Sequence, residues 1–283
     1  MSRVAYVNGA YVPHHQACIH IEDRGYQFSD GVYEVWAVRQ GKMLDSAGHF
    51  RRLKRSLGEL RIAMPMSVGA LGVVLREIMR KNRVRNGLIY LQITRGVAPR
   101  DHAFPKDTFP SIVITAKSTN PAKADQTAKN GVAVITVPDE RWARCDIKTV
   151  SLLPNILAKQ AAHEKGAFEA WMVDAHGQIT EGSSSNAWII TRDGVLTTRN
   201  LSSDILGGIT RAHVLTLAAE RQMKVEERSF SLEEAQSAQE AFMTSATTLV
   251  TPITHIDGVA VGEGKPGSMA RALRKDYLQS AAT

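Results

Sequence analysis

Residues 141–148 read Arg-Trp-Ala-Arg-Cys-Asp-Ile-Lys, and the last of them, Lys148, is the residue around which we expect the chain to be organised. The stretch follows residues 132–137, where valines recur as in a strand that enters a core. It precedes residues 151–155, where a proline and an asparagine indicate a bend into a helix. A lysine held inside loses proton affinity, so it can form a Schiff base and act as a base. The alternative is an exposed lysine that merely follows a strand, because buried lysines are rare.

The length and charge of the chain limit its possible functions. Its 283 residues can bury a sizeable core and fit one large or two medium domains. The 35 basic and 28 acidic residues give a net charge of +7, but the basic residues are dense only over residues 51–55. A dispersed excess argues against a nucleic-acid groove binder. It would instead attract small dicarboxylates and phosphates.

Neither a membrane protein nor a metalloprotein is expected. No apolar run approaches the roughly 20 residues of a membrane span, and the N-terminus lacks a secretion-signal pattern. Cys18 and Cys145 form neither a CxxC pair nor a disulfide framework, as is usual in a reducing compartment. We therefore expect a cytoplasmic protein. No histidine or cysteine cluster has the spacing of metal ligands, so no metal is expected.

The first 117 residues alternate between strand and helix patterns. Asn8 and Gly9 suit a type I′ turn between strands at residues 4–7 and 10–12. The further elements predicted are a hairpin turning at Gln40-Gly41, a helix with an apolar stripe over residues 50–60, a helix capped by Ser67, and strands at residues 88–94 and 112–116. This order predicts an α+β domain over residues 1–117.

Residues 118–130 contain Pro121 and no apolar period, which is typical of an interdomain linker. A second, larger domain is predicted over residues 131–283. Its predicted strands are residues 170–173, 187–191, 195–198, 241–243 and 250–254. Its predicted helices are residues 155–165, residues 210–222 with Thr210 as the cap, and a helix that begins with the capping box Ser231 and Glu234.

Residues 141–148, with Leu152-Leu153-Pro154-Asn155 and the residues that follow to Ala161, closely resemble the segment of the pyridoxal phosphate lysine in fold-type IV (class IV) aminotransferases. The branch that the chain resembles most is the D-amino acid transaminases. The resemblance runs from the motif at residues 23–35 to about Gly258, which is nearly the whole chain. It implies an α+β fold of two domains, a small N-terminal α/β domain and a larger, β-barrel-like C-terminal domain with helices.

The resemblance implies pyridoxal 5′-phosphate as the cofactor and Lys148 as the lysine that binds it and acts in catalysis. It also implies that Glu181 pairs with the pyridine nitrogen. A nearby anion favours the protonated ring, which then accepts electrons from the substrate. Judged from its neighbours alone, Glu181 would be an ordinary loop glutamate before the polar turn at residues 183–186.

The cofactor phosphate needs donors, and residues 206–210, Leu-Gly-Gly-Ile-Thr, open a predicted helix whose first amides could supply them. A plain glycine loop with an N-cap is the alternative. The resemblance implies Ile209 and Thr210 as phosphate ligands. It completes the site with Arg52 and with Ser245 and Ala246 in the loop at residues 244–247.

Tyr33, Arg100 and His102 resemble the group that binds the substrate carboxylate in D-amino acid transaminases. The planar fork of arginine takes both carboxylate oxygens, and a hydroxyl and an imidazole add oriented hydrogen bonds. In the family, Arg100 and His102 would come from the neighbouring subunit, which implies a homodimer with shared active sites. The alternative is an exposed charged loop.

We thus expect a pyridoxal phosphate transaminase that moves an amino group from a D-amino acid, such as D-alanine or D-glutamate, to a 2-oxo acid such as 2-oxoglutarate or pyruvate. The same fold leaves open a branched-chain L-amino acid transaminase, an (R)-amine transaminase and an aminodeoxychorismate lyase. All of these would keep Lys148 and Glu181. A basic binding protein without chemistry is the alternative of a different class, and only the net charge favours it.

Overall fold

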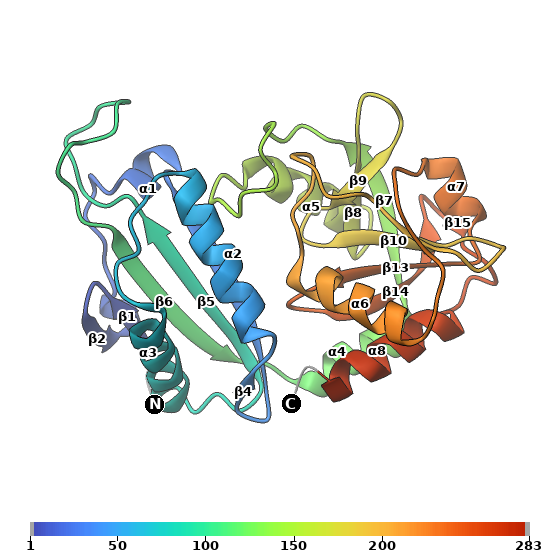
Figure 1. Ribbon diagram of the computed structural model, residues 1–283, viewed down its shortest axis with the longest axis horizontal. Coiled ribbons are helices and arrows are strands. Elements are labelled where there is room, and N and C mark those ends of the chain that lie inside the picture. Colours follow the sequence, from blue (N-terminus) through green and yellow to red (C-terminus); the bar gives the residue numbers. More distant parts are fainter. Residues whose placement is uncertain (1–2, 281–283) are drawn as a thin grey trace. The chain divides into compact units, whose positions relative to one another are not determined.

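The protein, seen in a computed structural model that describes residues 3–280, forms two compact units (Figure 1). Unit 1 contains the residues up to Pro121 together with Ile147–Ser151. Unit 2 contains Ala122–Asp146 and the residues from Leu152 onward. The chain therefore returns to unit 1 for five residues, and Lys148 is one of them. The boundaries predicted from sequence did not include this return.

An antiparallel sheet forms one layer of unit 1, with the strand order β2-β1-β6-β5-β3-β4. Its strands are β1 (Val4–Val7), β2 (Ala10–Pro13), β3 (Gly31–Arg39), β4 (Lys42–Met43), β5 (Gly87–Thr94) and β6 (Ser111–Ser118). The predicted hairpin is present, with Val7 opposite Ala10 and φ angles of 45° at Asn8 and 99° at Gly9. Positive φ at both positions is what a type I′ turn requires.

Two helices, α2 (Ser46–Glu59) and α3 (Val68–Lys81), form the second layer of unit 1 (Figure 1). The apolar stripe of each helix faces the sheet, and each fully buried leucine contributes roughly 1.5–3 kcal/mol. The side chains that fill this core include Trp36, Leu53, Leu57, Leu71, Leu75, Ile78, Ile89 and Leu91. The Ser67 hydroxyl accepts a hydrogen bond from the Ala70 amide at 3.2 Å, which confirms the predicted cap. The short helices η1 (His14–Gln16) and α1 (Arg24–Phe28) precede β3.

The segment Ile147–Ser151 lies along the free edge of β3. The Tyr33 amide donates to the Lys148 carbonyl at 3.0 Å, and the Val150 amide donates to the Gly31 carbonyl at 3.1 Å. The other neighbour on this side, β4, pairs only with Val38 and Arg39 at the far end of β3. The buried side chain of Ile147 joins the unit 1 core. These contacts fix the backbone of Lys148 to β3 of unit 1.

Unit 2 is built on a sheet in the order β12-β11-β10-β13-β14-β7-β8-β9, with β15 beside β14. Its strands are β7 (Val132–Pro138), β8 (Glu169–Val173), β9 (Ile179–Gly182), β10 (Asn186–Ile190), β11 (Leu196–Thr198), β12 (Val225–Glu227), β13 (Glu240–Ser245), β14 (Leu249–Ile256) and β15 (Val259–Ala260). Four strands separate β10 from β9 in this order, yet only residues 183–185 connect them. The sheet must therefore curl back on itself, which confirms the barrel-like architecture.

Five helices accompany this sheet: α4 (Pro121–Asn130), α5 (Leu153–Glu164), α6 (Ile209–Glu220), α7 (Leu232–Ser237) and α8 (Ser268–Ser280). Helix α5 packs on β8, α6 on β13, and α8 on β14. The core inside the curl includes Trp171, Ile179, Ile189, Phe230, Met243 and Ile253. The capping box at α7 is partly confirmed, because the Ser231 hydroxyl accepts from the Glu234 amide at 3.2 Å.

Two local predictions need correction. Helix α6 begins at Ile209 with Gly208 as its N-cap, so Thr210 is inside the first turn and is not the cap. The segment expected to be an irregular linker, residues 118–130, is helical over Pro121–Asn130, because a proline is tolerated in the first turn and Ala128 gives the helix a buried contact. No helix within residues 3–280 is long and apolar enough to cross a membrane.

Candidate active site

Lys148 is half-buried, and its amine lies beside the hydroxyl of Tyr33 in unit 1. The distance from Lys148 Nζ to Tyr33 Oη is 3.2 Å, and Nζ is 4.3 Å from the centre of the Tyr33 ring. The Tyr33 ring packs against that of Tyr90 at 5.7 Å, and burial together with Tyr33 raises the pKa of Tyr90 to about 12. A tyrosine hydroxyl at this distance can exchange a hydrogen bond with the amine. The structure thus brings together two of the predicted site residues.

Arg52 forms a bidentate ion pair with Glu34, a fully buried carboxylate on β3. Arg52 Nε donates to Glu34 Oε1 at 2.7 Å, and Arg52 Nη2 donates to Oε2 at 2.8 Å. His49 Nδ1 lies 2.7 Å from the same Oε2. Burial alone would raise the pKa of Glu34, but the charge of Arg52 and the hydrogen bonds from Arg52 and His49 lower it to about 2. The guanidinium that the family resemblance assigns to the phosphate is therefore held in a fixed orientation.

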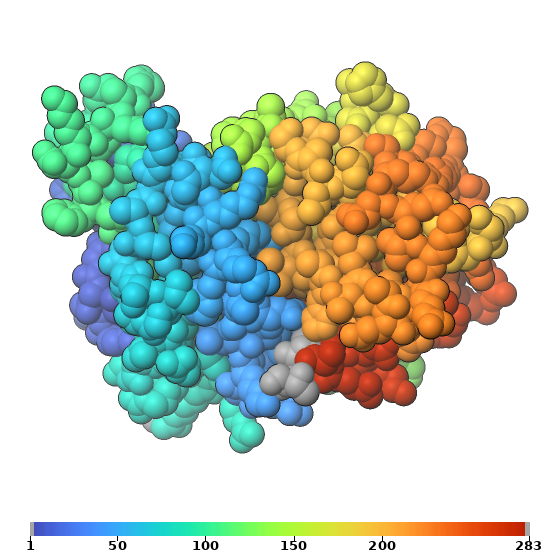
Figure 2. Space-filling model, in the orientation of Figure 1, coloured from blue at the N-terminus to red at the C-terminus, as the bar shows by residue number. Residues whose placement is uncertain are grey.

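Arg100 and His102 lie on the loop between β5 and β6, which stands out from the surface of unit 1 (Figure 2). The guanidinium carbon of Arg100 is 4.6 Å from the centre of the Phe28 ring, and the His102 ring is 5.5 Å from it. Within residues 3–280, neither residue forms a hydrogen bond or ion pair with Tyr33 or Lys148. Arg100 and His102 of one chain therefore share a contact with Phe28. Neither is hydrogen-bonded to Tyr33, the third member of the predicted carboxylate group.

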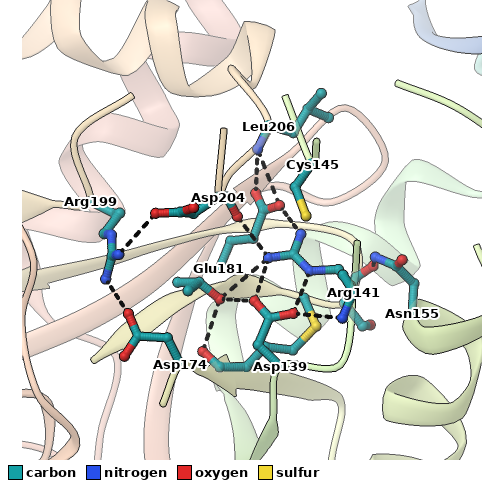
Figure 3. Close-up of polar contacts among 12 residues, drawn as sticks. Asp139, Arg141, Cys145, Asn155, Asp174, Glu181, Arg199, Asp204 and Leu206 are labelled. Carbon is teal, nitrogen blue, oxygen red and sulfur yellow. Dashed lines mark hydrogen bonds and ion pairs between the residues drawn. The ribbon is translucent and has the colours of Figure 1, made fainter. Parts of the chain in front are cut away.

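Glu181, at the end of β9, is buried and both of its carboxylate oxygens accept hydrogen bonds (Figure 3). The Leu206 amide donates to both oxygens at 3.1 Å, and Asn186 Nδ2 donates to Oε2 at 2.9 Å. Arg141 forms a short ion pair with Oε1. These donors from three separate segments fix the direction of the carboxylate.

Arg141 is itself held by a second layer of acceptors. Its Nε and Nη2 donate to the two oxygens of Asp139 at 2.9 and 2.7 Å, and Nη2 also reaches the Asp204 carbonyl at 2.9 Å (Figure 3). The Thr180 hydroxyl donates to Asp139 at 2.6 Å. Burial would raise the pKa of Asp139, but the hydrogen bond and charge of Arg141 lower it. Arg141 is thus a buried cation that links Asp139 to Glu181.

The N-terminus of α6 has the features of an anion site in unit 2. Its N-cap, Gly208, provides no side chain to bond the first amides of this twelve-residue helix. A Cβ at Gly208 would lie 2.1 Å from the Asn186 carboxamide oxygen, so the backbone can approach Asn186 only as glycine. The side chain of Thr210 is buried, and that of Ile209 is half-buried. The first-turn amides therefore have no side-chain cap in the described chain.

Ser245 and Ala246 begin the turn between β13 and β14. The Ser245 hydroxyl accepts from the Thr248 amide at 3.1 Å and lies 2.8 Å from the Thr248 hydroxyl. Leu249 closes the turn with a φ of 59°, which is unusual for a large side chain. Arg274 on α8 donates to the carbonyls on both sides of it, Thr248 at 2.9 Å and Val250 at 2.7 Å. Hydrogen bonds within the turn and from Arg274 thus hold the predicted phosphate loop in place.

Sequence reasoning gave no role to several residues that shape these sites. The ones with direct contacts are Asp139, Arg141, Asn186, Glu34 and His49. A further case is Glu169, which is buried and accepts hydrogen bonds from Ser184 at 2.9 Å and from Ser185 at 3.3 Å, residues that follow Glu181 in the chain. A glutamate inside the otherwise apolar run at residues 168–173 was the available signal. Residues 3–280 contain no group of three or more side chains suited to hold a metal ion.

Comparisons with known proteins place the chain among enzymes of one kind. The family described as Amino-transferase class IV matches residues 31–256. A D-alanine aminotransferase of Listeria monocytogenes serotype 4b (strain F2365) is 41% identical over 274 residues, which cover 96% of this chain and 94% of the relative. A D-alanine aminotransferase of Bacillus licheniformis is 39% identical over 279 residues, or 97% of both chains.

Two solved structures have the same fold. The branched-chain amino acid aminotransferase of Escherichia coli matches with a TM-score of 0.90 at 24% identity, covering 99% of this chain and 95% of that chain. The branched-chain aminotransferase of the thermophilic archaeon Thermoproteus uzoniensis, solved with norvaline, matches with a TM-score of 0.85 at 26% identity, covering 99% and 94%.

Proposed function

Because this chain belongs to the class IV aminotransferases, we propose that it transfers an amino group from a D-amino acid, such as D-alanine or D-glutamate, to a 2-oxo acid such as 2-oxoglutarate or pyruvate. Relatives named D-alanine aminotransferase share about two fifths of its residues over nearly its full length. The observation that supports the chemistry most directly is the amine of Lys148, held 3.2 Å from the Tyr33 hydroxyl on a segment fixed to β3.

The residues present fit pyridoxal phosphate as the cofactor. Glu181 offers an oriented carboxylate for the pyridine nitrogen, and Lys148 offers an amine for the aldehyde. The uncapped N-terminus of α6, with Ile209 and Thr210, offers amides for the phosphate. We assign Arg52 and the turn at Ser245 and Ala246 to the same phosphate. When bound, the cofactor supplies the electron sink for the reaction.

The protein's own groups would then carry the proton transfers. Lys148 would be the base that takes the proton from the substrate Cα and the acid that delivers it on the cofactor side, so one amine would serve in both roles. The Tyr33 hydroxyl lies within hydrogen-bond distance of the Lys148 amine and orients it. Glu181 holds a proton on the ring nitrogen of the cofactor, and Arg141 keeps Glu181 in place.

The donor carboxylate is assigned to Tyr33, Arg100 and His102, which gives the preference for D-amino acids. We propose that Arg100 and His102 serve the active site of a second copy, because neither contacts Lys148 within the described part of its own chain. Large apolar side chains near their loop are exposed, among them Ile21, Tyr26 and Phe109, which is 92% exposed. Contact with a second copy would remove these apolar side chains from water. The proposed partner is therefore an identical chain.

We also propose a cytoplasmic location. Both cysteines are free thiols, and Cys18 is exposed to solvent. An exposed free thiol is typical of a reducing compartment.

The experiment is a screen of amino donors in both enantiomers with 2-oxoglutarate and with pyruvate. We expect D-alanine and D-glutamate to be turned over much faster than their L-enantiomers. Lys148→Ala should abolish turnover while the fold is kept, as judged by circular dichroism. The second candidate is a branched-chain L-amino acid aminotransferase, because the Thermoproteus uzoniensis enzyme of that name is 26% identical to this chain. If L-leucine or L-valine outpaces every D-donor, that second reading replaces the first.

A further inference from the structure

Asp30 lies immediately before β3, three residues from Tyr33, and its carboxylate holds two buried arginines. Asp30 Oδ2 accepts from Arg24 Nε at 2.8 Å and from Arg95 Nε at 2.7 Å, and Oδ1 accepts from Arg95 Nη2 at 2.9 Å. Arg24 is 3% exposed and Arg95 is 5% exposed. One carboxylate therefore balances two desolvated positive charges, so its loss would leave buried charge without compensation.

Arg24 connects Asp30 to the loop that carries Arg100 and His102. Its Nη1 donates to the Asp101 carbonyl at 2.5 Å, and Nη2 donates to the His102 carbonyl at 3.4 Å. Phe28, from the same short helix, contacts the side chains of Arg100 and His102 with its ring. Helix α1 therefore holds the backbone of this loop through Arg24 and two of its side chains through Phe28.

Arg95 holds the same loop at a second point. Its guanidinium carbon lies 3.6 Å from the centre of the Phe104 ring, close enough for a cation–π contact. Its Nη1 and Nη2 also donate to the Arg61 and Leu60 carbonyls at 3.1 and 2.8 Å, which anchors it to the end of α2. The loop is thus fixed on both sides of His102, and both fixing arginines depend on Asp30.

We propose that Asp30 is a positioning residue for recognition of the donor carboxylate. Through Arg24 and Arg95 it fixes residues 97–110, and with them the position in which Arg100 and His102 are presented to the second copy. This inference rests on the proposed function, because it assumes that Arg100 and His102 bind a carboxylate. Donors without a carboxylate, such as (R)-amines, do not use this contact and should be insensitive to Asp30.

The test compares Asp30→Asn with Asp107→Asn, which removes the same charge from an exposed position of the same loop. For Asp30→Asn, we expect kcat/KM for D-alanine to fall roughly ten- to a hundredfold, mostly through KM. This is the effect of losing one charge-assisted contact, here the contact between Arg100 and the donor carboxylate. The value for an (R)-amine should stay within about twofold. Asp107→Asn should resemble the parent with both donors.

A second readout needs neither cofactor nor turnover. Trypsin cuts after Arg100, so release of the loop in Asp30→Asn should speed cleavage of the apoprotein at this site relative to Asp107→Asn, in which the Arg100-Asp101 bond is unchanged. Arg24→Lys is the variant to use if Asp30→Asn does not fold. Lysine keeps the positive charge beside Asp30. It lacks the guanidinium that also donates to the Asp101 and His102 carbonyls, so the same donor-dependent loss is expected.

The outcomes distinguish the role of Asp30 from the proposed function. An equal loss for D-alanine and the (R)-amine, or unchanged loop cleavage, would overturn the role of Asp30 and leave the proposed function standing. A parent enzyme that does not distinguish D-alanine from L-alanine would overturn the proposed function itself, and the role of Asp30 in recognition would fall with it.

Discussion

Glu34 and Arg52 form a bidentate ion pair inside unit 1, with N–O distances of 2.7 and 2.8 Å and a carboxylate that is not exposed at all. Breaking a pair of this kind leaves a buried charge and costs about 3–5 kcal/mol. We expect Glu34→Gln to lower the free energy of unfolding of the apoprotein by that amount in urea denaturation. Glu77→Gln, which disrupts an exposed pair with Arg80, should change it little.

The same pair predicts a pH dependence. The pKa of Glu34 is lowered from 4.5 to about 2, so its stabilising contribution is complete above about 4.5 and is lost as the pH falls towards 2. Parent apoprotein should therefore lose stability over this window more steeply than Glu34→Gln. Parallel pH profiles for the two proteins, measured by thermal unfolding, would contradict the assignment.

Glu181→Gln should slow proton abstraction from the donor more than it weakens cofactor binding. A neutral carboxamide keeps the shape of the side chain but supplies no negative charge to the ring nitrogen. Single-turnover kinetics with D-alanine measure the first effect, and titration of apoprotein with pyridoxal phosphate measures the second. Unchanged single-turnover rates would remove Glu181 from this role.

Gly208→Ala should weaken the phosphate site because the new methyl group would meet Asn186 at 2.1 Å and displace it from Glu181 and Leu206. The matched control is Gly207→Ala, whose nearest neighbour would be a Leu201 methyl group at an ordinary 3.8 Å. We expect a fall in affinity for pyridoxal phosphate of at least roughly tenfold in the first variant only. Equal affinities in the two variants would argue against the assigned site.

Arg100→Ala should raise KM for D-alanine by roughly ten- to a hundredfold, since one charge-assisted contact to the carboxylate is lost. (R)-amines should be poorer donors for the parent and suffer less from the substitution. A mixing experiment tests the sharing of active sites. If Arg100 serves a neighbouring subunit, the weakened Arg100→Ala chain and the inactive Lys148→Ala chain should together regain parent-like KM when they form mixed dimers.

Much of the fold was predictable from local patterns. The turn at Asn8-Gly9, the cap at Ser67 and the apolar stripes of α2 and α3 each depend on residues close together in the chain, so periodicity identifies them. Helix α8 was missed, although Ala270, Leu273 and Tyr277 recur at the spacing of a buried stripe, because charged residues at four of its thirteen positions obscure the stripe. Helix α1 has only five residues, too few for a periodic signal.

The residues that orient the site were less predictable. The resemblance identified Glu181 but not its partners. Arg141 lies 40 positions away and the Leu206 amide 25 positions away, and no sequence pattern pairs groups over such separations. Asp30 and its two arginines are a similar case, since Arg95 lies 65 positions away. Burial and hydrogen bonding of charged groups depend on tertiary structure, which spacing along the chain does not reveal.

The return of Ile147–Ser151 to β3 also bears on the order of folding during synthesis. A ribosome that has released only the first 121 residues has made every strand of the unit 1 sheet, yet the edge of β3 at Gly31 and Tyr33 still lacks its partner. That edge can be closed only after β7 and the loop behind it have left the exit tunnel. Lys148 therefore reaches its place on β3 late in synthesis. A fragment that ends at residue 121 would expose an unpaired strand edge and would be prone to aggregate.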